Sequence, residues 1–103
     1  MNVETTFIQD LVVLTPDVFE DSRGYFFEGY NKNKLSALGI DIEFVQDNQS
    51  FSQRGTLRGL HYQNPPYAQT KLVRVLQGEI MDVAVDLRKD SPTYGQHFTI
   101  RLS

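Results

Sequence analysis

Residues 71–88 read KLVRVLQGEIMDVAVDLR, and this stretch decides the fold class. Two sets of side chains alternate along its second half: Met81, Val83, Val85 and Leu87 on one face, and Asp82, Asp86 and Arg88 on the other. A two-residue alternation is typical of a β-strand. The interruption at Gln77-Gly78-Glu79 predicts a tight turn, because glycine readily adopts positive φ. We therefore expect two antiparallel strands joined as a hairpin.

Further strands are predicted on both sides of this hairpin. Downstream, Phe98, Ile100 and Leu102 alternate with polar residues after a turn-forming segment, Ser91 to Gly95. Upstream, three short strands are expected: Leu11 to Thr15, ended by Pro16; Tyr25 to Glu28, entered through the turn at Asp21 to Gly24; and Glu43 to Gln46.

Helix is scarce in this pattern. One short helix is expected from Lys32 to Leu38, with Asn31 as its N-cap and Gly39 as its C-terminal stop. Many short strands with glycine and proline turns indicate an all-β sandwich or barrel. The chain ends at Ser103 directly after a strand that has no following partner, so we expect a single domain, 1–103, truncated at its C-terminus.

Composition limits the classes of function. The 103 residues suffice for one small core, and a hydrophobic content of 40% is that of a folded chain. Ten basic residues against thirteen acidic ones, scattered along the sequence, give no sign of a nucleic-acid or membrane partner. Without cysteine, a spanning apolar run or a signal peptide, the expected location is the cytoplasm.

The residues that suggest chemistry flank a diproline turn. If the two flanking segments pair symmetrically about Pro66, His61 lies directly across from Lys71. A neighbouring ammonium disfavours protonated imidazole, which would leave His61 able to act as a base. The same ammonium could stabilise negative charge on a substrate oxygen. Together, a base and a cation are what proton abstraction next to a carbonyl requires.

Plainer interpretations stay open for each of these residues. A histidine in a hairpin can be structural, and we take His97 on its alternating strand to be so. Arg58 and Arg23 could bind phosphate bidentately or form surface ion pairs. A metal site is not expected, because His61 is followed by no second histidine or carboxylate at ligand spacing.

Five motifs in order give the chain a family resemblance. They are Asp21-Ser22-Arg23-Gly24-Tyr25-Phe26-Phe27-Glu28, Gln46-Asp47-Asn48-Gln49-Ser50, Arg58-Gly59-Leu60-His61-Tyr62-Gln63, Lys71-Leu72-Val73-Arg74-Val75, and Asp82-Val83-Ala84-Val85-Asp86-Leu87-Arg88 followed by Ser91-Pro92-Thr93-Tyr94-Gly95. From about Phe7 onward, the sequence resembles the dTDP-4-dehydrorhamnose 3,5-epimerases.

The resemblance implies a fold, a reaction and a site. The fold would be a cupin-type, jelly-roll-like antiparallel barrel in a homodimer that uses no metal or other cofactor. The substrate would be dTDP-4-dehydro-6-deoxy-D-glucose, converted to dTDP-4-dehydro-L-rhamnose in dTDP-L-rhamnose biosynthesis. His61 would remove the protons at C3 and C5, and Lys71 would stabilise the enolate. The residues implied to bind the nucleotide sugar are Arg23, Glu28, Gln46, Asn48 and Arg58.

Length separates this chain from that family. Its members extend well beyond 103 residues, and their second half supplies further barrel strands, a tyrosine proton donor and a carboxylate that orients the histidine. We therefore expect the barrel to be incomplete at this length. Two alternatives to the epimerase follow: a non-catalytic nucleotide-sugar-binding fragment, and a sugar-nucleotide ketoisomerase on the same fold.

Overall fold

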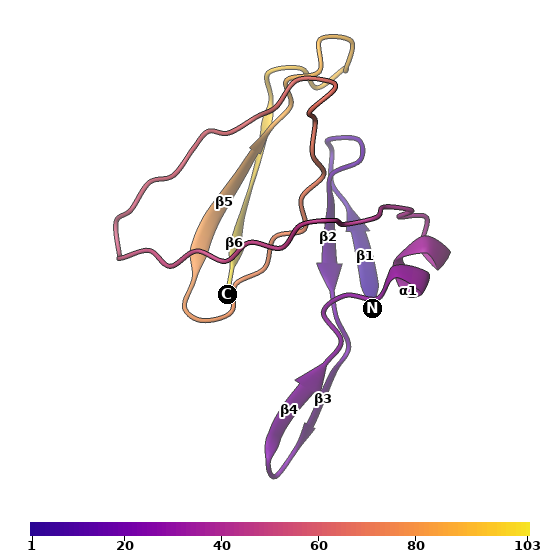
Figure 1. Ribbon diagram of the computed structural model, residues 1–103, viewed down its shortest axis with the longest axis vertical. Coiled ribbons are helices and arrows are strands. Elements are labelled where there is room, and N and C mark those ends of the chain that lie inside the picture. Colours follow the sequence, from indigo (N-terminus) through magenta and orange to yellow (C-terminus); the bar gives the residue numbers. More distant parts are fainter. The chain divides into compact units, whose positions relative to one another are not determined.

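The computed structural model describes residues 1–103 and is mostly β with one short helix, as predicted. The elements, labelled in Figure 1, are β1 (Asn2–Thr5), β2 (Val12–Thr15), β3 (Val18–Asp21), β4 (Gly24–Phe27), α1 (Lys32–Ala37), β5 (Ile80–Val85) and β6 (His97–Leu102). The strands form three two-stranded antiparallel sheets, β1–β2, β3–β4 and β5–β6, each between neighbours in the chain. The sheets are therefore separate hairpins and do not join into a closed barrel.

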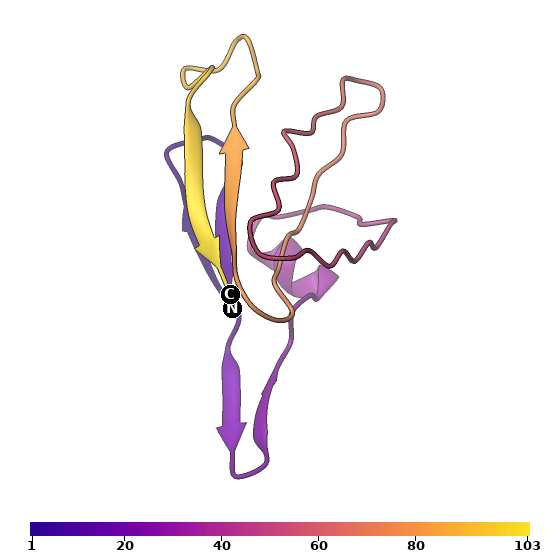
Figure 2. The same ribbon diagram turned by 90° about the vertical axis from the view of Figure 1, so that its left-hand side faces the viewer.

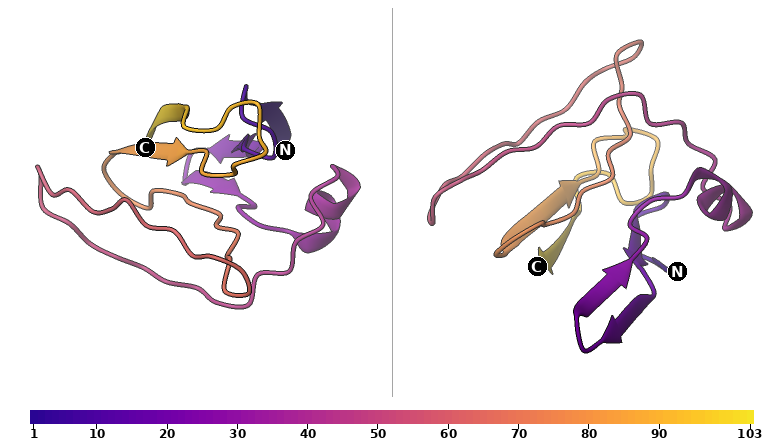
Figure 3. Two further views of the ribbon diagram at one scale, coloured as in Figure 1. Left: turned by 90° about the horizontal axis from the view of Figure 1, so that it is seen from above. Right: turned by 60° about the horizontal axis from the view of Figure 1, so that its bottom comes forward.

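The chain divides into two compact units. The first combines Met1–Asn31 with Val73–Ser103 and holds all six strands, and the second is Lys32–Leu72. Figure 2 shows the hairpins of the first unit as pairs of arrows, and Figure 3 shows α1 of the second unit leading into a long segment without strands.

In the first hairpin, β2 confirms the predicted strand before Pro16, whereas β1 escaped the sequence analysis. Val3 is the only apolar residue among the four in β1, so alternation gave no signal. The strand exists because β2 pairs with it, with Val3 opposite Leu14. The loop between them closes where the Thr6 amide donates to the Leu11 carbonyl at 3.2 Å.

The second hairpin pairs β3 with β4 through the predicted turn at Asp21–Gly24. An Asp21 carboxylate oxygen accepts the backbone N–H of Arg23 at 2.8 Å, and Gly24 has φ +133°. Both features suit a tight turn, since aspartate bonds to the backbone two residues on and glycine adopts positive φ. The register places Phe19 opposite Phe26, both on an exposed surface.

The third hairpin corrects the prediction for residues 71–88. Gly78 has φ +85° at the predicted turn, but Lys71–Leu76 forms no strand, and β5 pairs with β6 instead, Val83 opposite Thr99. Backbone bonds beyond β5 explain the choice of partner. The Asp86 amide donates to the Gln96 carbonyl at 2.9 Å, and the Asp86 carbonyl accepts the Gly95 amide at 2.7 Å. These bonds continue the ladder toward the β6 side, where the strand predicted over Phe98–Leu102 is confirmed.

The burial of side chains in and after β5 also differs from the burial that the alternating pattern predicts. The side chains of Met81, Val83 and Leu87 are exposed, whereas Asp86 from the opposite face is buried at 4% exposure. Apart from Asp86, only Ile8 and Leu35 are buried, so the described chain has little core. No helix of the structure has the length and apolar character needed to cross a membrane.

The helix agrees with its predicted stop signal. At its end, the Gly39 amide donates to the Ser36 carbonyl at 3.0 Å and the Ile40 amide to the Leu35 carbonyl at 2.9 Å, with Gly39 at φ +85°. This pair of bonds is the Schellman motif, in which glycine takes the left-handed position without a Cβ clash. The strand predicted at Glu43–Gln46 does not form. Val45 in this segment is 92% exposed, so no packed surface is present whose burial would stabilise a strand.

Candidate functional site

The diproline turn lies within the second unit. The Tyr67 amide donates to the Asn64 carbonyl at 2.9 Å, so the turn is centred between Pro65 and Pro66. The predicted ladder, symmetric about Pro66, does not form, and the register prediction was wrong in that respect. Pro65 and Pro66 occupy the two central positions of the turn, and an isolated two-stranded hairpin is marginal in water.

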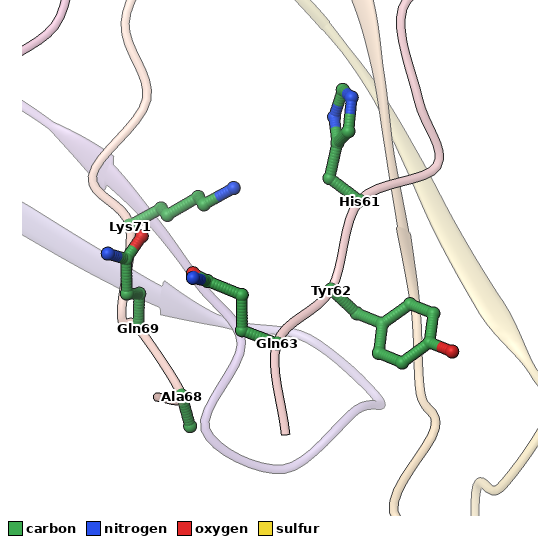
Figure 4. A pocket seen from close by; sticks show the side chains of 6 residues that line it. All are labelled: His61, Tyr62, Gln63, Ala68, Gln69 and Lys71. Carbon is green, nitrogen blue, oxygen red and sulfur yellow. The ribbon is translucent and has the colours of Figure 1, made fainter. Parts of the chain in front are cut away.

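The segments on both sides of the turn still line a common open hollow of about 630 Å³. Its lining comes from His61, Tyr62 and Gln63 before the turn and from Ala68, Gln69 and Lys71 after it. Figure 4 shows the side chain of Lys71 reaching toward the segment that carries His61. The structure therefore brings the two predicted catalytic side chains to one site without a strand ladder.

The chemistry available in this hollow is that of an imidazole and an ammonium group facing open solvent. Both His61 and Lys71 are exposed. An ammonium in a water-filled site stabilises a developing oxyanion weakly, because the interaction energy falls as the dielectric constant rises. The arrangement supplies a base and a cation, and its catalytic strength depends on what excludes water around them.

Four of the six hollow-lining residues were not selected from the sequence: Tyr62, Gln63, Ala68 and Gln69. Gln63 and Gln69 each stand two positions from a predicted catalytic residue, His61 and Lys71 respectively. Side chains two apart along an extended chain point to the same side. This spacing is the signal that could have identified them. In Figure 4, the Gln63 amide extends toward the segment of Gln69 and Lys71, while the Tyr62 ring points the other way.

Three further predicted binding residues lie in the same unit, each with a local partner. The guanidinium of Arg58 donates to the Ser52 hydroxyl at 2.8 Å and to the Phe51 carbonyl at 3.2 Å. Gln46 donates from its amide to the Asn48 side-chain carbonyl at 3.3 Å. These bonds hold Gln46 and Asn48 together, and place Arg58 on the Phe51–Ser52 segment.

Arg23 and Glu28, the other two predicted binding residues, belong to the first unit. Arg23 Nη2 lies 2.6 Å from Asp21 Oδ2, so the guanidinium forms the surface ion pair that the sequence left open. Hydrogen bonds from Arg23 hold the pKa of the Asp21 carboxyl below its usual value, and the same pair raises the pKa of Arg23. Glu28 accepts a hydrogen bond from the Asn31 amide at 3.2 Å.

The ion pair of Arg23 borders a second, smaller hollow of about 220 Å³. Its lining is Phe19, Asp21, Arg23, Gly24, Tyr25 and Phe26. The Tyr25 ring stacks on Phe27 with 6.0 Å between centroids and 14° between planes. The β3–β4 hairpin thus presents one cation beside exposed aromatic rings.

The structure contains no group of three or more histidine, aspartate or glutamate side chains placed to hold a metal ion. His97 stands on β6 opposite Val85 and does not line the hollow of His61.

Comparison with known proteins adds independent findings. A family model described as dTDP-4-dehydrorhamnose 3,5-epimerase matches residues 5–103. Enzymes of that name from Shigella flexneri and Pseudomonas aeruginosa are 54% and 56% identical to the chain. The matches cover 100% and 93% of this chain but 58% and 53% of those enzymes. The chain thus spans little more than half the length of the curated relatives it matches.

Solved structures give the same correspondence. A crystal structure of dTDP-4-dehydrorhamnose 3,5-epimerase from Bacillus anthracis, with TDP and PPi bound, matches with a TM-score of 0.95 at 53% identity, over 99% of this chain and 59% of that one. A dTDP-6-deoxy-D-glucose-3,5-epimerase from Legionella pneumophila, in complex with dTDP-4-keto-L-rhamnose, matches with a TM-score of 0.92 at 48% identity, over 99% and 54%.

Proposed function

Because the chain belongs to the dTDP-4-dehydrorhamnose 3,5-epimerase family, we propose that it carries the proton-abstracting half of such an epimerase site. The reaction would convert dTDP-4-dehydro-6-deoxy-D-glucose to dTDP-4-dehydro-L-rhamnose, within dTDP-L-rhamnose biosynthesis. The observation that carries the proposal is the common hollow of His61 and Lys71, in a chain more than half identical to enzymes of that name.

In this proposal, His61 is the base. Its imidazole takes the proton from C3 and, in a separate step, from C5, since both carbons neighbour the C4 ketone. Each abstraction leaves an enolate with its charge on the C4 oxygen. The Lys71 ammonium stabilises that charge, which is the interaction that makes a weak carbon acid reactive.

The nucleotide-sugar substrate is proposed from the ligands of the relatives. The Bacillus anthracis structure holds TDP and PPi, and the Legionella pneumophila structure holds dTDP-4-keto-L-rhamnose. A diphosphate suits the guanidinium groups of Arg23 and Arg58, which bind phosphate oxygens in pairs. Arg23 would exchange its exposed partner Asp21 for the ligand. Gln46, Asn48 and Glu28 would hydrogen-bond the sugar and nucleoside.

Inversion requires more than these residues supply. A proton must return to the opposite face of the enolate, and the hollow offers no acid across from His61 beyond Lys71. We propose that the site is completed within a cupin-type barrel, of which both units here form a single domain, and in a homodimer. Gel filtration with light scattering tests the dimer, and a strictly monomeric chain would contradict it.

The experiment is proton exchange in D2O. The chain is incubated with dTDP-4-dehydro-6-deoxy-D-glucose, and C3 and C5 are followed by NMR. Deuterium at both carbons is the expected result, and its incorporation should be much slower in His61→Asn, which keeps a polar side chain but removes the base. His97→Asn is the matched control, because it changes the other histidine outside the hollow, and it should exchange like the unchanged chain.

Three outcomes separate the candidates. Exchange with inversion means that the chain completes the site, and exchange without inversion means that the opposite-face donor is absent. No exchange, together with saturable dTDP binding, would support the second candidate, a non-catalytic nucleotide-sugar-binding fragment. The exposure of both His61 and Lys71 to solvent is the observation that favours this candidate. Formation of a 3-keto sugar would instead reveal the ketoisomerase.

A further inference from the structure

The most completely bonded side chain of the molecule is a carboxylate outside the proposed site. Asp86 directly follows β5, and its side chain is 1% exposed. Oδ1 accepts from the Arg88 backbone amide at 3.0 Å and from Arg88 Nε at 2.9 Å. Oδ2 accepts from the hydroxyls of Ser91 at 2.5 Å and Thr93 at 2.6 Å. The carboxylate therefore fastens the turn between β5 and β6.

The charge of this carboxylate follows from the same contacts. Arg88 contributes most, and the two hydroxyls add to it, so that together they hold the pKa of Asp86 well below the usual range of a carboxyl. Every donor around Asp86 favours the ionised form. At neutral pH the group is a fixed anion within the first unit.

Arg88 connects this anion to a distant part of the chain. Besides Asp86, its Nη2 donates to the Gln9 carbonyl at 2.9 Å, and its Nη1 lies 3.3 Å from Asp10 Oδ2. Gln9 and Asp10 belong to the loop of the β1–β2 hairpin, which precedes Arg88 by 78 to 79 positions. One planar guanidinium thus reaches both hairpins at once.

The loop of the β1–β2 hairpin also buries Ile8 within the first unit, at 5% exposure. β1 and β2 pair only with each other, as do β5 and β6, so no ladder joins them. The aromatic contact between Phe7 and Phe98 is edge-on, with 6.4 Å between ring centroids. Most of the polar contacts between the β1–β2 hairpin and the β5–β6 hairpin are therefore made by the Arg88 side chain.

We propose that Asp86 and Arg88 form a latch that fixes the loop of the β1–β2 hairpin, residues 6–11, onto the β5–β6 hairpin. Asp86 orients the guanidinium, and the guanidinium holds the loop through Gln9 and Asp10. When the guanidinium is removed, the N-terminal hairpin detaches and opens, while β5–β6 keeps its own ladder. The latch is a conformational device, independent of the chemistry at His61.

Amide hydrogen exchange on the 103-residue chain tests the latch. In Arg88→Met, the amides of Thr6 and Leu11, bonded within the loop, should exchange about tenfold faster, because a lone hairpin is marginal once detached. The amides within β5 and β6 should keep their rates. Arg101→Met is the matched control, since it removes an exposed arginine, paired with Glu79, from the same β5–β6 hairpin.

The results divide clearly. Faster exchange at Thr6 and Leu11 in Arg88→Met, with Arg101→Met unchanged, supports the latch. Faster exchange confined to residues 91–96 would mean that Arg88 serves only its own turn, and equal effects in both variants would mean a general loss of charge; either overturns the latch. If Arg88→Met does not fold, Arg88→Lys decides by the same readout, because lysine keeps the charge but lacks the fork that reaches Gln9.

Discussion

The hollow of His61 and Lys71 and the buried carboxylate of Asp86 contrast in almost every physical respect. The hollow lies between segments without strands, and its two charged or basic side chains are exposed. Asp86 is buried and accepts five hydrogen bonds from side-chain and backbone donors of Arg88, Ser91 and Thr93. The comparison teaches that the residues proposed for catalysis and the residues that stabilise the fold occupy separate segments. Changes in one region should therefore leave the other nearly untouched.

The largest expected effect tests the hollow. His61→Asn should lower the rate of deuterium exchange at C3 and C5 by about 10²–10⁴-fold, the contribution of a positioned general base. The thermal midpoint should not move, because the side chain is exposed. NMR exchange and a melting curve on the same sample check both statements. A variant that loses activity and stability together would break the proposed separation.

Removal of the cation should come next in size. Lys71→Met keeps the aliphatic stem and should slow exchange by less than the roughly 10²–10³-fold typical of an oxyanion-stabilising group in a water-excluded site, because Lys71 is exposed. Affinity for dTDP, measured by calorimetry, should stay the same, since Lys71 is assigned to the C4 oxygen and not to the nucleotide. Weaker dTDP binding with an unchanged exchange rate would reassign Lys71 to the diphosphate.

The next prediction concerns stability instead of catalysis, and it tests the buried carboxylate of Asp86. Asp86→Ala leaves the hydroxyls of Ser91 and Thr93 and the Arg88 guanidinium without their shared acceptor, and the thermal midpoint should fall by roughly 5–10 °C. Asp82→Ala on the preceding strand is the control. A midpoint that falls equally in both would show that Asp86 contributes no more than an ordinary strand position.

Low pH should destabilise the same region, which is the turn held by the Asp86 carboxylate. The pKa of Asp86 is lowered in the folded chain, so its stabilisation is present above the ordinary carboxyl pKa of about 4 and is lost as pH falls below that value. The charged group that faces this carboxylate is the Arg88 guanidinium, which also pairs with Asp10. Urea midpoints from pH 7 to pH 2 should fall steeply below pH 4 in the unchanged chain and less so in Asp86→Asn.

The smallest effect concerns the helix of the second unit. Gly39→Ala forces a Cβ into the left-handed conformation at φ +85° and should cost about 1 kcal/mol of unfolding free energy. Ser36→Ala, within the same helix, is the control and should cost less. Chemical denaturation measures both, and equal costs would show that the stop signal at Gly39 adds nothing.

Local patterns predicted much of this fold because they act over few residues. The stop at Gly39, the turn at Asp21–Gly24 and the alternation that ends at Leu102 each specify their own geometry. The pairing of β5 could not be predicted in the same way, because Lys71–Leu76 offers an equally apolar partner. What decided it was the bonding of Asp86 to a turn further along the chain, which alternation alone does not show.

Part of the candidate site could also be predicted, because it depends on residues that are close in sequence. His61 and Lys71 reach one hollow although the register about Pro66 was wrong, since a short turn keeps its flanks close in any register. The positions of Arg23 and Glu28 are a different matter. They are separated from His61 by more than 30 residues, and no local rule relates them. Their roles remain predictions drawn from the family resemblance.

The pairing of each strand with its neighbour in the chain has a kinetic consequence. Partners such as Phe19 and Phe26, or Val83 and Thr99, are close in sequence, so each hairpin can form within microseconds. The first unit, however, joins Met1–Asn31 to Val73–Ser103 across the whole of Lys32–Leu72. Closing that loop carries an entropy cost that grows with the logarithm of its length. The hairpins should therefore form early, and the meeting of the two chain ends should set the overall rate.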